Sequence, residues 1–243
     1  MLMSIVESAL SAPAYPDLAG KRVLITGLTS RCGVDIARAF AEHKGRLILQ
    51  FAETSKAMQT VAEIIAPDAL EAKVYGPVAR EQNEAVAFAQ TAAKVYGGLD
   101  VVINLVPLEP ADLDITASME DVERLVARQL TLPFLTSKIA ANRMSMMLTE
   151  GLVLNVATLA GAPKRARQAF ATVAKAGLSA MTRGQAEEWA GRAIRFNAIA
   201  PQTVMAEVGP RLRGEPDVAS LALYLASGQG KSLSGCVFEA EMR

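Results

Sequence analysis

The stretch KRVLITGLTSRCGVDIARAF, residues 21–40, decides how the rest of the chain is interpreted. It opens with an apolar, β-branched run over 22–26, turns at Gly27, and continues as a helical pattern over 34–43. Gly27 supplies a tight turn, and Gly33 allows a helix to pack closely on a strand. A strand, a glycine turn and a helix in this order are typical of the first unit of a dinucleotide-binding fold.

The same alternation continues along the chain. Buried strands are also predicted over 46–51, 101–106, 152–156, 194–200 and 236–239, and helices over 55–65, 81–96, 119–143, 166–189 and 217–227. Apolar strands separated by helices indicate an α/β fold, a Rossmann-like doubly wound parallel sheet with helices on both faces. We expect one domain over 20–243, preceded by an N-terminal extension over 1–19.

Composition excludes several classes of function. The 243 residues carry 25 basic and 25 acidic side chains, so net charge gives no case for a nucleic-acid partner. Cys32 and Cys236 are far apart and without metal-ligand spacing, which predicts free thiols in a reducing compartment and no metal site. No apolar run is long enough to span a bilayer, and the first 20 residues do not resemble a signal peptide. We therefore expect a cytoplasmic protein without a membrane partner.

Further motifs resemble those of one family over about residues 21–239. They are LDVVINLVP (99–107), VARQLTLPFLTSK (126–138), GLVLNVATLAG (151–161), IRFNAIAPQ (194–202) and SGCVF (234–238). Together with the first turn, they resemble the motifs of the short-chain dehydrogenase/reductase family. The resemblance implies a Rossmann fold and hydride transfer between NAD or NADP and a substrate carbonyl or hydroxyl.

The resemblance also implies a set of catalytic positions, most of which are altered here. In the family a Tyr exchanges the proton, a Lys four residues later lowers the Tyr pKa and holds the nicotinamide ribose, and a Ser orients the carbonyl. Lys175 is retained, but Ala171 stands where the Tyr belongs. Thr158 replaces the Ser, and Gln129 replaces a catalytic Asn. The sequence thus predicts no working catalytic residue in this chain.

No substitute proton donor is apparent in the sequence. The single histidine, His43, lies at the end of the first predicted helix, on the side that the family's reaction does not use. The four tyrosines, Tyr15, Tyr75, Tyr96 and Tyr224, lie far along the chain from both Thr158 and Lys175. Losing a positioned proton donor typically costs about 10²–10⁴ in rate.

The cofactor positions of the family are altered as well. Arg31 takes the place of the middle glycine, where a long side chain is expected to block the phosphates; alternatively it bends outward and binds phosphate as a cation. Phe51 stands where a carboxylate would contact the adenosine ribose, with Glu53 as the alternative group.

Gly76 and Pro77 replace the adenine-contacting carboxylate, so we expect no cofactor in this subunit. On this interpretation the remaining cofactor positions are structural remnants: Gly27, Gly33, Asn104 and Lys175.

Two further features concern the substrate-binding side and the subunit surface. Only 13 residues separate Pro201 from Glu215, which predicts that the family's substrate lid is missing. Helices 119–143 and 166–189, the family's subunit-interface pair, remain rich in Ala, Leu and Met.

The sequence therefore favours a non-catalytic subunit that stabilises an active paralogue in a hetero-oligomer, a tetramer by analogy with the family. NAD or NADP would then bind in the partner. The resemblance extends to the empty subunit of the hydroxyacyl-CoA dehydrogenase of anaerobic toluene breakdown. Two alternatives remain open: a divergent active NAD(P)-dependent oxidoreductase that uses Lys175 or water as its proton donor, and a nucleotide-sensing regulatory protein.

Overall fold

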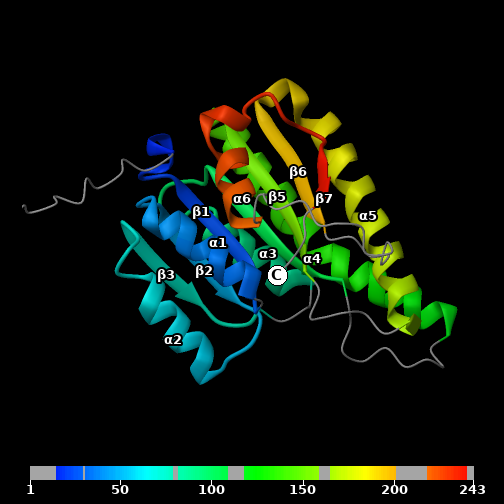
Figure 1. Cartoon of the computed structure of the whole chain (residues 1–243). Coiled ribbons are helices and arrows are strands. Elements are labelled where there is room, and N and C mark those ends of the chain that lie inside the picture. Colours follow the sequence, from blue (N-terminus) through cyan, green and yellow to red (C-terminus); the bar gives the residue numbers. More distant parts are fainter. Residues whose placement is uncertain are drawn as a thin grey trace, which may run out of the picture.

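A seven-stranded parallel sheet forms the centre of the molecule, in the order β3-β2-β1-β4-β5-β6-β7 (Figure 1). The computed structural model describes residues 15–29, 31–78, 82–108, 118–158, 165–200 and 218–239. The strands are β1 (Arg22–Leu28), β2 (Arg46–Phe51), β3 (Glu71–Tyr75), β4 (Val101–Pro107), β5 (Gly151–Thr158), β6 (Ile194–Ala200) and β7 (Val237–Glu239). The predicted fold class is confirmed.

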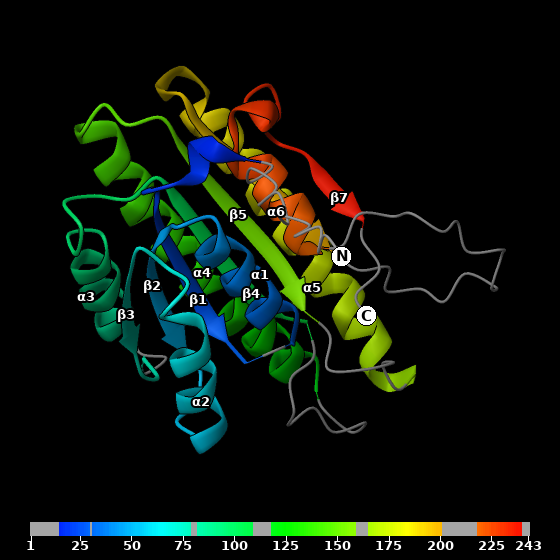
Figure 2. The same ribbon diagram turned by 60° about the vertical axis from the view of Figure 1, so that its left-hand side comes forward.

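Helices cover both faces of this sheet (Figures 1 and 2). They are α1 (Arg31–Glu42), α2 (Lys56–Ile65), α3 (Gln82–Ala92), α4 (Met119–Met146), α5 (Arg165–Trp189) and α6 (Val218–Ala226). One apolar cluster lies under α1 and α6 and includes Ile36, Phe40 and Leu225; another lies under α3, α4 and α5 and includes Ala92, Ala141 and Trp189. Burial of these two apolar layers is what drives the chain to this architecture.

The sequence missed β3, the edge strand that pairs with β2. None of its residues is buried, and Glu71, Lys73 and Val74 are exposed, so no continuous buried apolar run marks the strand. A half-covered edge strand needs no buried run, so the pattern that identified the central strands could not find it. The helix predicted over 81–96 is also shorter, because α3 ends at Ala92 and the chain then turns toward Gly97.

The described end of the predicted N-terminal extension packs against the domain. A short 3₁₀ turn, η1 (Pro16–Leu18), places Leu18 at 0% exposure in the core under α1. The Asp17 carboxylate accepts a hydrogen bond of 2.7 Å from the backbone N–H of Gly228. This part of the extension, residues 15–19, thus contacts the body of the fold, and the remainder, 1–14, lies outside the described residues.

A chain of buried amides and hydroxyls links the strands to the helices behind them. The Thr26 hydroxyl donates to Asn104 Oδ1 (3.1 Å), and Asn104 Nδ2 donates to Ser137 Oγ (3.0 Å) and Asn155 Oδ1 (2.9 Å). Asn155 Nδ2 in turn donates to the Thr182 hydroxyl at 3.0 Å. All five side chains are at most 3% exposed, so each depends on the others for its hydrogen bonds. Asn104 therefore has a structural role in this fold.

An ion pair fixes the amino-terminal edge of the sheet, where the parallel strands begin. The Asp100 carboxylate accepts hydrogen bonds from the backbone N–H of Arg22 (2.8 Å) and from its guanidinium Nε (2.9 Å) and Nη2 (2.7 Å). Burial raises the pKa of Asp100, but the hydrogen bonds and positive charge of Arg22 outweigh it, so the pKa lies below its usual 3.8.

Both cysteines are free thiols, as predicted, and burial, aided by nearby Asp35, raises the pKa of Cys32 to about 11. None of the helices in the described part of the chain combines the length and apolarity that crossing a membrane requires.

Replacing Asn104 tests the buried polar chain. Asn104→Leu leaves the polar groups of Thr26, Ser137 and Asn155 without this partner, so the free energy of unfolding should fall by about 2–3 kcal/mol. The matched change at an exposed position of α4, Asn142→Leu, should alter it by less than about 0.5 kcal/mol. Urea denaturation measures both. Equal losses in the two variants would contradict a stabilising role for the chain of amides.

The Arg22–Asp100 pair predicts a pH dependence of stability. Because the folded-state pKa of Asp100 is below 3.8, its contribution is present above that pH and is lost as the pH falls, when the unfolded chain binds protons first. Asp100→Asn should lower the unfolding free energy by about 1–3 kcal/mol at neutral pH and flatten its decline below about pH 4. Denaturation at a series of pH values, with exposed Glu63→Gln as the control, measures this. A decline as steep as that of the wild type would show that another group causes it.

Candidate functional site

The carboxyl ends of the parallel strands meet at one edge of the sheet, where doubly wound folds bind ligands. This edge brings together the end of β1 with its turn at Gly27, Phe51 of β2, Thr158 of β5 and Glu239 of β7. Lys175 of α5 reaches the same edge, because its ammonium contacts Glu239. The edge is therefore the candidate site, and it collects residues that are more than 200 positions apart in the sequence.

Gly27, near the end of β1, occupies a position that only glycine fits. Gly27 has a φ of +76°, and a Cβ at this position would lie 2.6 Å from the carbonyl oxygen of Leu105. Only glycine permits both the left-handed conformation and this close approach to β4. Gly33 is buried near the start of α1, a position consistent with close helix packing. Arg31 begins α1, but its side chain lies outside the described residues, so its two predicted positions remain untested.

Gln50 is a residue of this site that the sequence interpretation missed. Its side chain is 3% exposed, and its Oε1 accepts a 2.8 Å hydrogen bond from the backbone N–H of Gly27. Its Nε2 donates to the carbonyl oxygens of Phe51 (2.5 Å) and Gly76 (3.3 Å). One amide thus joins the first turn to the ends of β2 and β3. The available signal was a polar residue inside the apolar run RLILQF.

At the adenosine end, the described residues offer little to contact a ribose. Phe51 is 3% exposed and packs in the core under α1, whereas the side chain of Glu53 is exposed. Gly76 and Pro77 are also exposed. At the end of β2, therefore, no carboxylate is positioned to meet the adenosine ribose of a nicotinamide nucleotide.

Lys175 is paired with a carboxylate that sequence spacing did not reveal. Its Nζ lies 2.7 Å from Glu239 Oε1, with side-chain exposures of 16% for the lysine and 55% for the glutamate. Glu239 is the last residue of β7, and 64 positions separate the two. Only the folding of β7 beside β6 brings them together.

The position four residues before Lys175 is closed by packing. Ala171 is 0% exposed and belongs to an apolar cluster with Leu108, Ala157 and Ala200. Thr158, at the end of β5, is 6% exposed, and its carbonyl oxygen accepts a 2.9 Å hydrogen bond from the N–H of Leu108. The carboxyl edge thus carries the Thr158 hydroxyl and the Lys175 ammonium. It has the methyl group of Ala171 where the family resemblance implies a tyrosine.

Gln129 of α4 is half-buried, and its Oε1 is buried without a hydrogen-bond partner among the described residues. The segment 201–215, predicted to lack a lid, lies outside the described residues.

His43 follows α1 near the start of β2, where its Nδ1 lies 2.8 Å from the Ala39 carbonyl oxygen and its ring 6.0 Å from that of Tyr15. His43 is therefore remote from the candidate site.

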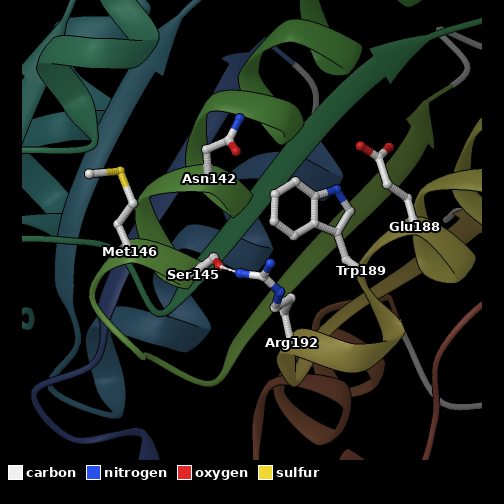
Figure 3. A pocket seen from close by; sticks show the side chains of 6 residues that line it. All are labelled: Asn142, Ser145, Met146, Glu188, Trp189 and Arg192. Carbon is white, nitrogen blue, oxygen red and sulfur yellow. Dashed lines mark hydrogen bonds between the residues drawn. The ribbon is translucent and has the colours of Figure 1, made fainter.

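Two hollows lie at the opposite edge of the sheet and do not belong to this site. The larger, about 350 Å³, lies where α4 and α5 end and is lined by Asn142, Ser145, Met146, Glu188, Trp189 and Arg192 (Figure 3). Trp189 is 14 positions beyond Lys175 on α5, which corresponds to about 21 Å along a helix. The second, about 240 Å³, is lined by charged residues of the amino edge, among them Lys21, Glu150 and Arg195.

Known proteins match the chain over most of its length. The model of the short chain dehydrogenase family matches residues 21–216. An uncharacterized oxidoreductase of Thermotoga maritima is 30% identical over 209 residues, covering 86% of this chain and 82% of that protein. Glucose 1-dehydrogenase 2 of Bacillus subtilis is 30% identical over 241 residues, covering 91% and 93%. A solved short-chain type dehydrogenase/reductase of Mycobacterium marinum superposes with a TM-score of 0.74 at 25% identity, covering 93% and 95%.

The first turn generates a prediction with a matched control. Gly27→Ala should lower the unfolding free energy by about 1–2 kcal/mol for the left-handed conformation and by about 1–3 kcal/mol more for the collision with the Leu105 carbonyl. Gly97 has the same conformation, φ +77°, but a Cβ added there would have no atom within 4 Å, so Gly97→Ala should show the first cost alone. Thermal or urea denaturation compares them. Equal losses would show that the close approach to β4 imposes no constraint.

Proposed function

The chain belongs to the short chain dehydrogenase family, and from this premise we propose that it takes part in NAD(P)-dependent oxidoreduction of a hydroxyl or carbonyl substrate. The observation that carries the proposal is family similarity along nearly the whole chain together with a retained Lys175 at the carboxyl edge. Among the relatives, a 3-oxoacyl-[acyl-carrier-protein] reductase of Synechocystis is 28% identical over 223 residues. The names of these relatives support an oxidoreductase more than any other class of protein.

The first candidate is an active enzyme that transfers its proton without a tyrosine, and the relatives favour it. Backbone N–H groups at the start of α1 and the Lys175 ammonium are the groups that would hold the nucleotide. When bound, the nicotinamide would supply the hydride. The Thr158 hydroxyl would orient the substrate carbonyl, and the Lys175 ammonium, or a water that it binds, would provide the proton to the carbonyl oxygen.

The second candidate is a non-catalytic subunit, and Ala171 favours it. A buried methyl group cannot exchange a proton, and the four tyrosines of the chain lie on other elements. In this case the nucleotide would bind in an active paralogue held through α4 and α5, the predicted interface helices over 119–143 and 166–189. Phe134 and Val173, 38% and 51% exposed on these helices, are apolar side chains that such a partner would cover. The hydroxyacyl-CoA substrate of the complex stays a prediction.

One experiment on the purified chain separates the two candidates. If the chain is an active enzyme, it should bind NADH or NADPH saturably in a fluorescence titration. It should also oxidise this nucleotide in the presence of 3-oxoacyl, sugar or other carbonyl substrates. Lys175→Met should then lower the rate at least about 10²-fold, because it removes the proposed proton donor. Lys231→Met is the matched control, since Lys231 is also ion-paired, at 2.9 Å from Glu150, but lies at the amino edge.

The opposite result is equally specific. No nucleotide binding and no turnover by the chain alone, with equimolar co-purification of a second family member that retains the Tyr and Lys, would replace the first candidate by the second. A chain that binds nucleotide but converts none of these substrates would instead favour the regulatory alternative.

A further inference from the structure

The ion pair between Lys175 and Glu239 joins the centre of α5 to the end of the last strand. The two charged atoms lie 2.7 Å apart, within the range of a charge-assisted hydrogen bond. The lysine side chain is 16% exposed and the glutamate side chain 55% exposed, so the ion pair is partly open to solvent. Glu239 provides the opposite charge beside the lysine ammonium.

The positions one helical turn away on α5 do not supply this opposite charge. One turn before the lysine stands Ala171, whose methyl group is packed among apolar side chains. One turn after it, the Ser179 hydroxyl donates to the backbone carbonyl of Lys175 at 2.8 Å rather than to its side chain. The carboxylate that holds the ammonium therefore comes from β7, an element that is far away in sequence.

The placement of Glu239 is itself determined by the sheet. β7 pairs in parallel with β6, with Glu239 opposite Ala200. Ala200 belongs to the same apolar cluster as Ala171, so the carboxylate is held beside the part of α5 that carries Lys175. Register between two strands thus fixes the position of the lysine head group.

We propose that Glu239 is the positioning residue of Lys175, holding its ammonium at the carboxyl edge where the ribose of a nicotinamide nucleotide would bind. The inference deepens the proposed function and rests on it. It assigns a role in nucleotide affinity to the end of β7, and it explains how the lysine stays at the site when the residue one turn earlier is alanine.

The first test measures the lysine directly and needs no activity. The wild type, Glu239→Gln and Glu239→Asp are acylated with an N-hydroxysuccinimide ester, and the rate of labelling at Lys175 is followed by mass spectrometry. The rate should rise about fivefold in Glu239→Gln, the order expected for loss of one partly exposed ion pair, and should be largely restored by the charge-retaining Glu239→Asp. Glu63→Gln, on the exposed face of α2, should leave it unchanged. Unaltered labelling in Glu239→Gln overturns the proposal.

The second test measures the effect on nucleotide. In NADH fluorescence titrations, Glu239→Gln should raise the dissociation constant about three- to tenfold, and the same change in a Lys175→Met background should have no further effect. An equal loss in both backgrounds would show that Glu239 does not act through Lys175. If the wild type binds no NADH, the nucleotide role falls together with the proposed enzyme, whereas the labelling rates still decide whether Glu239 fixes the lysine.

Discussion

The buried chain from Thr26 through Asn104 and Asn155 to Thr182 is the interaction on which the rest of the structure depends. It passes through β1, β4 and β5 and continues into α4 and α5, so its hydrogen bonds form only when these five elements are in one register. A register shift of one residue in a strand would turn its member of the polar chain (Thr26, Asn104 or Asn155) to the other face of the sheet. Several polar groups would then be buried without partners. Apolar burial favours compactness, but this chain of amides selects one arrangement of the carboxyl edge.

Much of the fold was predictable from the sequence because its central strands are covered on both faces. β1, β4, β5 and β6 appear as apolar runs, and their predicted and observed ranges agree closely. β3 was missed because an edge strand carries charges where a central strand cannot. The site was predictable only where a residue is recognised by its place in a local motif, as for Gly27, Thr158 and Lys175. Gln50 and Glu239 act through partners distant in sequence, and no local spacing identifies them.

Sequence similarity favours an active enzyme, whereas the residue at position 171 favours an inactive one, and this disagreement has a physical origin. An identity of 30% over most of the chain is an average over all matched positions and does not single out any one of them. In the family, the resemblance implies, one tyrosine exchanges the proton, and at the matching position 171 this chain has a methyl group within a packed cluster. A single position contributes little to overall identity and decides much of the chemistry. Similarity therefore establishes the family, and the proposed measurements decide between an active enzyme and a non-catalytic subunit.

The exposed edge formed by β3 has a consequence for how copies of this protein can meet. Glu71 and Lys73 are exposed along that edge, and Glu71 forms an ion pair with Arg46 of the neighbouring strand at 3.0 Å. Extending the sheet from one molecule to the next would strip these charges of water, which disfavours ribbons and fibrils grown strand upon strand.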